Sequence, residues 1–128
     1  MTPDAAITEP ALTHLVETFY GRVRQDDLIG PLFNDAVHDW PAHLAKLADF
    51  WSSVMLTSGR YKGNPMLAHL RLKTVTPGHF VRWLWLFRAT AAELFEPAIA
   101  GAFIARAETI ARSLQLGMFF RPGLQTGS

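Results

Sequence analysis

Residues 39–55 read DWPAHLAKLADFWSSVM, and their spacing indicates the fold class of the chain. Asp39 is a favourable helix N-cap, and Pro41 lies in the first turn, where its missing N–H costs nothing. One face carries four residues at i, i+4, i+7 and i+11: His43, Leu47, Phe50 and Val54. Trp51 and Met55 widen this apolar arc. Three polar residues are expected on the opposite face: Asp49, Ser52 and Ser53.

The same helical period, about 3.6 residues, continues towards the N-terminus. We expect a first long helix capped by Thr8, with Pro10 near its start and the cluster at 25–27 at its end. Its apolar stripe is formed by Leu12, Leu15, Val16, Phe19 and Val23, with Tyr20 on the flank. A short helical turn is expected from Ile29 to Phe33.

The C-terminal half is also predicted to be helical. Residues 58–65 have loop composition, and a short helix from Met66 to Arg71 would carry His69. Thr76 caps a helix from Pro77 to about Phe95, which is apolar on most of its circumference and is therefore expected to be central. Pro97 opens a final helix with one apolar side: Ile99, Phe103, Ile110, Leu114 and Met118. The tail from 121 is expected to fray. Convincing strand alternation is absent, so the sequence predicts an all-α fold.

The bulk properties exclude several classes of function. The 128 residues suit one domain, 1–128, with a core over about 10–120. The net charge is +1 with scattered Lys and Arg, which argues against nucleic-acid binding. Cysteine is absent, so thiol catalysis, disulfides and Cys-ligated metal sites are excluded. Neither an apolar signal core nor an apolar run of the roughly 20 residues that span a membrane is present, and we expect a cytoplasmic protein.

Histidine supplies the only neutral-pH bases and the strongest nitrogen ligands of the chain. The five histidines include no i, i+4 pair and no HExxH, so a His-cluster metal site is not expected. His14 and His79 are most simply surface residues. His69 differs because the loop before it sets its position independently of the long helices. Taken singly, however, His69 is more often a structural histidine than an iron ligand.

Five blocks of sequence, taken together, resemble the group III truncated haemoglobins. They are the runs 19–24 (FYGRVR), 28–34 (LIGPLFN), 43–51 (HLAKLADFW), 61–66 (YKGNPM, with His69 three residues on) and 83–87 (WLWLF). Their order and spacing agree with that family over nearly the whole chain, from Leu12 to Phe120. The paired glycines of groups I and II are missing, since Gly21 and Gly30 stand singly, and this favours group III.

The resemblance implies a two-over-two helical sandwich, a globin-like fold, that encloses haem b. It implies that His69 is the proximal iron ligand, that Phe33 packs on the porphyrin and that Lys46 pairs with a propionate. Three residues would form the distal, ligand-stabilising or gating set: Tyr20, His43 and Trp83. The remaining cofactor contacts would be Leu47, Phe50, Tyr61, Met66, Leu70 and Phe87.

The function implied is reversible binding of O2, CO or NO, with Tyr20 and Trp83 donating hydrogen bonds to the ligand. NO dioxygenase or peroxidase-like activity would be secondary and would need a reductase as electron donor. A monomer is favoured. The alternative is a cofactor-free or haem-sensing interaction module that retains the globin fold, and prosthetic-group absorbance separates the two.

Overall fold

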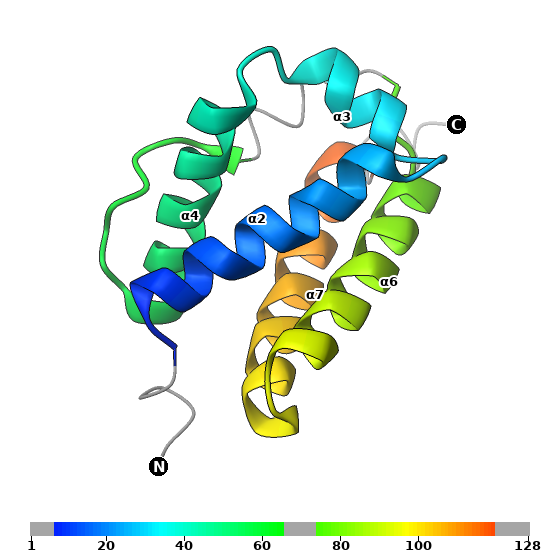
Figure 1. Cartoon of the computed structure of the whole chain (residues 1–128). Coiled ribbons are helices and arrows are strands. Elements are labelled where there is room, and N and C mark those ends of the chain that lie inside the picture. The colour runs from blue at the N-terminus through cyan, green and yellow to red at the C-terminus, as the bar shows by residue number, and fades with distance from the viewer. Residues whose placement is uncertain (1–6, 66–73, 120–128) are drawn as a thin grey trace.

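The structure is a computed structural model that describes residues 7–65 and 74–119 (Figure 1). Five helices lie in these ranges: α2 (Glu9–Gln25), α3 (Gly30–Ala36), α4 (Trp40–Leu56), α6 (Pro77–Leu94) and α7 (Pro97–Phe119). The described residues include no strand, which confirms the all-α prediction. The predicted helix over 66–71 and the predicted frayed tail lie outside the described residues. None of the described helices is long and apolar enough to cross a membrane.

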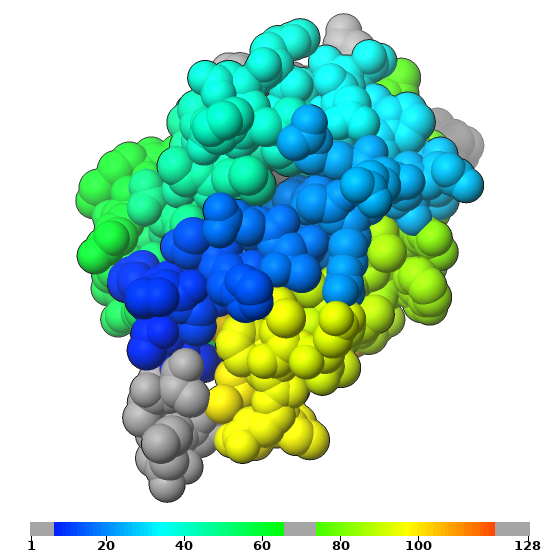
Figure 2. Space-filling view, in the orientation of Figure 1, coloured from blue at the N-terminus to red at the C-terminus, as the bar shows by residue number. Residues whose placement is uncertain are grey.

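The helices are arranged as two pairs that pack across each other. α2 packs against α4, α6 packs against α7, and α2 crosses α6 (Figure 1). In the space-filling view the side chains of α2 fill the space between α4 and α6 on one face (Figure 2). The core between the pairs is aromatic. Phe87 is fully buried, with its ring stacked between those of Trp51 and Trp83 at centroid distances of 5.2 and 5.4 Å.

Local chemistry places the helix starts where the sequence predicts them. The Thr8 hydroxyl accepts a hydrogen bond from the Ala11 N–H (3.2 Å), and the Asp39 carboxylate accepts one from the Ala42 N–H (3.2 Å). Each bond satisfies a donor that the first turn of a helix leaves without an intrahelical partner. Residues within one turn of sequence thus fix where α2 and α4 begin.

The junction between α2 and α3 brings the backbones of the two helices close together. A Cβ at Gly30 would lie 2.9 Å from the Arg24 carbonyl oxygen, so only glycine permits this approach. The same carbonyl accepts a hydrogen bond from the Asn34 side-chain amide (3.1 Å). The buried Asp26 carboxylate accepts the N–H groups of Leu28 and Ile29, both at 3.0 Å. α3 is therefore held in a defined position beside the end of α2.

Two expectations about helix faces are wrong. Ser52 is not on a polar face but fully buried, since its hydroxyl donates to the Glu9 carboxylate (2.7 Å) and lies 2.7 Å from the Ser58 hydroxyl. α6 was expected to be central because most of its circumference is apolar. One side of the helix instead faces solvent, where Val81 and Trp85 are 67% and 56% exposed. The Arg82 guanidinium covers the Trp85 ring at 4.4 Å, which shields part of its apolar surface from water.

Candidate functional site

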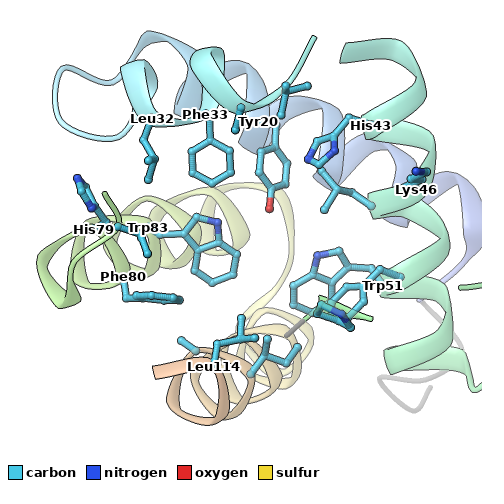
Figure 3. Close-up of a pocket in the computed structure, with 18 of the residues that line it drawn as sticks. Tyr20, Leu32, Phe33, His43, Lys46, Trp51, His79, Phe80, Trp83 and Leu114 are labelled. Atoms are coloured by element: carbon cyan, nitrogen blue, oxygen red, sulfur yellow. The ribbon is translucent and has the colours of Figure 1, made fainter. Parts of the chain in front are cut away.

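A cavity of about 550 Å³ lies between α2, α3 and α4 on one side and α6 and α7 on the other (Figure 3). Its volume falls within the roughly 300–1,000 Å³ of small-molecule sites. Most of its wall is apolar. The aromatic lining residues are Tyr20, Phe33, Phe50, Trp51, Tyr61, Phe80 and Trp83. The larger aliphatic ones are Leu32, Val37, Leu47, Val75, Ile110 and Leu114. Such a chamber suits a flat apolar ligand better than a polar one.

One polar group inside the chamber is the hydroxyl of Tyr20. This residue is on α2, is 4% exposed, and directs its hydroxyl into the cavity (Figure 3). Burial raises the pKa of Tyr20 to about 12, and a side-chain hydrogen bond with Trp83 opposes that rise. The phenol therefore stays neutral at physiological pH and keeps its proton as a hydrogen-bond donor.

Trp83 on α6 sets the direction in which the Tyr20 hydroxyl donates. An indole N–H can only donate, so in the hydrogen bond between these side chains the Tyr20 oxygen is the acceptor. The phenol O–H is then left to donate into the cavity. The indole is itself held by aromatic neighbours, stacked on Phe87 and edge-on to Phe19 at a centroid distance of 5.3 Å. Tyr20 and Trp83 thus act as one unit.

The mouth of the cavity lies along the start of α4. All exposed residues in the described part of the wall fall between 36 and 46: Ala36, His38, Asp39, Ala42 and Lys46. His43 is half-buried at this mouth. Its pKa is lowered first by burial and second by the positive charge of Lys46, so its imidazole is neutral at physiological pH. The chamber is therefore apolar at depth and carries two charged side chains, those of Asp39 and Lys46, at its entrance.

Comparisons with known proteins agree with this geometry. No family model matches the chain. A curated protein of Campylobacter jejuni, "Group 3 truncated hemoglobin ctb", is 32% identical over 121 residues, which are 91% of this chain and 94% of that protein. The chain belongs to the group III truncated haemoglobins. The crystal structure of group III truncated hemoglobin from Campylobacter jejuni matches this globin with a TM-score of 0.85 and 31% identity, over 90% of this chain and 94% of that one. The globin-like, two-over-two fold class is thereby confirmed.

The structure gathers most of the predicted site residues of this truncated haemoglobin around one cavity. They are Tyr20, Phe33, His43, Lys46, Leu47, Phe50, Tyr61 and Trp83. Phe87 is not in the wall, because it is buried behind Trp51 and Trp83. The helical spacing of Phe87 predicts that its side chain faces the interior, but not whether it lines the cavity or packs in the core. Three predicted residues lie outside the described ranges: Met66, His69 and Leu70.

The sequence interpretation missed three polar residues of the wall as site residues: His38, Asp39 and His79. His79, which was expected at the surface, is half-buried. Its Nδ1 accepts a hydrogen bond from the Thr76 N–H at the start of α6 (2.9 Å). This hydrogen bond could have been predicted from sequence, because His79 is three residues after the cap, where Glu or Gln usually accepts such a bond.

The wall from the C-terminal half of this globin was also missed as a ligand surface. Phe80 of α6 and Ile110, Ala111 and Leu114 of α7 form it. Their helical spacing predicts a buried face correctly. That spacing does not reveal whether the face packs on protein or on a bound group.

Proposed function

We propose that this truncated haemoglobin binds haem b in the cavity, with His69 as the proximal iron ligand, and reversibly binds O2, CO and NO. The observation that carries the proposal is the buried, neutral Tyr20 hydroxyl directed into a mostly apolar chamber (Figure 3). A chamber that bound only an apolar molecule would have no use for a donor at this depth. The Campylobacter jejuni relative is named a hemoglobin, which supports the same ligand class.

The wall fits a porphyrin chemically. A flat macrocycle needs aromatic and aliphatic contacts on its faces, and Phe33, Phe50 and Leu114 are among those the cavity offers. The two haem carboxylates need water or a cation. They would find both at the mouth, where Lys46 is exposed. The assignment of His69 rests on the resemblance to the group III truncated haemoglobins, in which His69 follows the block 61–66.

Bound haem supplies an iron with one coordination position open to a diatomic ligand. Tyr20, Trp83 and His43 would position and retain that ligand. The Tyr20 O–H donates to it in a dry environment, where a hydrogen bond to a partly charged acceptor is strong. Trp83 keeps the phenol oriented, and His43 stands at the entrance. Strong retention suits chemistry on the ligand better than its delivery, so we include NO or peroxide turnover with a separate reductase in the proposal.

The test is optical spectroscopy of the purified chain after loading with haem. His69→Gly should lose the axial nitrogen and its ferrous spectrum, and added imidazole should restore both. His14→Gly, at an exposed position of α2, is the control and should leave the spectra unchanged. Unchanged spectra in His69→Gly would assign the ligand elsewhere. Failure of the chain to take up any haem would favour the cofactor-free module instead.

A further inference from the structure

An aromatic side chain supports His43 from behind, outside the cavity wall. Trp40 is the first residue of α4, is 9% exposed and does not line the cavity. Its ring lies edge-on to the His43 imidazole, with a centroid distance of 5.6 Å and an interplanar angle of 89°. The imidazole also lies edge-on to the Tyr20 ring, at 89° and with centroids 6.5 Å apart, and the Tyr20 and Trp40 rings are 6.4 Å from each other. His43, Tyr20 and Trp40 therefore form one cluster of three mutually contacting rings.

Trp40 is in turn covered by a cation from another helix. The Arg24 guanidinium lies 4.6 Å from the centroid of the Trp40 ring, in cation–π geometry. The backbone of Arg24 is held firmly, because its carbonyl oxygen accepts the Asn34 amide and packs against Gly30. The last turn of α2 thus clamps the first residue of α4.

We propose that Arg24 and Trp40 are positioning residues that hold the His43 imidazole inward at the cavity mouth and thereby slow the entry of small ligands. This inference rests on the proposed function, since entry matters only if a ligand binds inside. His43 is half-buried at the mouth and not fully enclosed. The Trp40 ring occupies the space beside the imidazole, and the Arg24 guanidinium restricts the movement of that ring.

The charges around His43 favour the same inward state. Lys46 on the same helix and Arg24 from α2 are both cationic. Among the described residues of the cavity wall, one carries a carboxylate, Asp39, and this carboxylate accepts a hydrogen bond from the Ala42 N–H. Burial and Lys46 keep the pKa of His43 below its usual value, and a neutral imidazole can lie against apolar rings without a charged group to solvate. Loosening the clamp admits water to the imidazole and removes this preference.

The first experiment measures CO association after flash photolysis of the haem-loaded chain. Arg24→Met removes the cation but keeps a side chain of similar length, and Trp40→Leu removes the ring. Each should speed association, with about a two- to fivefold effect for Arg24→Met if a cation–π contact of ordinary strength at an exposed site is lost. The double variant should be no faster than Trp40→Leu alone, since Arg24 acts through Trp40. Additive effects, or an Arg24→Met rate equal to that of the unmodified chain, would overturn the proposal.

The control is Trp85→Phe, which removes another tryptophan under an arginine. Its partner Arg82 lies 4.4 Å from the ring, but Trp85 is outside the cavity wall. This variant should leave association unchanged. If it speeds association as much as Trp40→Leu does, the effect comes from general loosening of the fold and the proposal fails.

A second readout does not depend on haem. The His43 ring signals of the full chain as isolated can be titrated by NMR, with selectively labelled histidine. The pKa of His43 should rise in Arg24→Met and in Trp40→Leu, because a looser Trp40 ring leaves the imidazole less buried, and should stay constant in Trp85→Phe. Should the chain bind no haem, the proposed function fails while this result still tests the clamp. An unchanged His43 titration in both variants, with the helices intact by circular dichroism, would refute it.

Discussion

Replacement of Tyr20 by Phe tests the distal site in the smallest possible step. The substitution removes one oxygen atom and keeps the ring, which packs edge-on to Phe19 at 4.7 Å and contacts Phe33 at 5.8 Å between centroids. The lost interaction is a hydrogen bond from a fully buried phenol to a partly charged ligand. Such bonds contribute about 1.5–3 kcal/mol, so O2 dissociation should become roughly ten- to 150-fold faster.

The Trp83→Phe variant should also speed dissociation, but by less. Its N–H is used on the Tyr20 oxygen, so its loss leaves the phenol in place but free to turn. In the Tyr20→Phe background the Trp83 substitution should therefore add little, which is non-additivity expected of residues in one hydrogen-bond chain. Two independent donors, as the sequence alone implies, would give additive effects instead.

The assay is displacement of O2 by excess CO in a stopped-flow spectrometer. Tyr61→Phe is the matched control, because Tyr61 also lines the cavity but packs its hydroxyl beside Gly63 and its ring edge-on to Phe50. Its dissociation rate should stay within about twofold of the unmodified chain. The reasoning is refuted if Tyr20→Phe leaves the rate unchanged, or if Tyr61→Phe accelerates it equally.

Two predictions concern stability and are read from urea or thermal unfolding. Asp26→Asn should lower the free energy of unfolding by about 1.5–3 kcal/mol, whereas exposed Asp27→Asn should change it by less than about 0.5 kcal/mol. The hydrogen bond from Arg82 is the main reason that the pKa of Asp26 is lowered. The ionised Asp26 carboxylate therefore stabilises the fold above its unfolded pKa of about 3.9, and this stabilisation is lost as the pH falls through the lower folded pKa. The gap between the unmodified chain and Asp26→Asn should thus close in acid, and a gap independent of pH would contradict the assignment. Gly30→Ala should lower the free energy of unfolding by about 1–3 kcal/mol, because the added Cβ meets the backbone of α2. Gly21→Ala, where nothing lies within 4 Å of the added Cβ, should raise it by about 0.5–1 kcal/mol. Equal effects of the two substitutions would disprove the close approach.

The features of the fold that depend on a few neighbouring residues could be predicted from sequence. Thr8 and Asp39 cap their helices with bonds that span three residues, and such chemistry is visible in the sequence. Ser52 was misplaced because its burial depends on Glu9, 43 residues away, which no local period reveals. Periodicity predicts which face is buried, but not what that face meets.

The same limit applies to the site. Tyr20 and His43 were identified through a resemblance that spans nearly the whole chain, and the structure adds how they are held. The role proposed for Trp40 could not be predicted from sequence, because it depends on the contact of its ring with His43 and on a cation from another helix, Arg24 of α2. The contact between Tyr20 and Trp83 likewise joins α2 to α6, so the sequence alone could not reveal it.

If this chain is a haem protein, a haemin titration of the full chain will show it. We expect a saturable increase in a Soret band that ends at one haem per chain, and a shift of that band when CO is added to the reduced protein. Unsaturable absorbance, typical of haemin adsorbed to protein surfaces, or no Soret band at all, would contradict it.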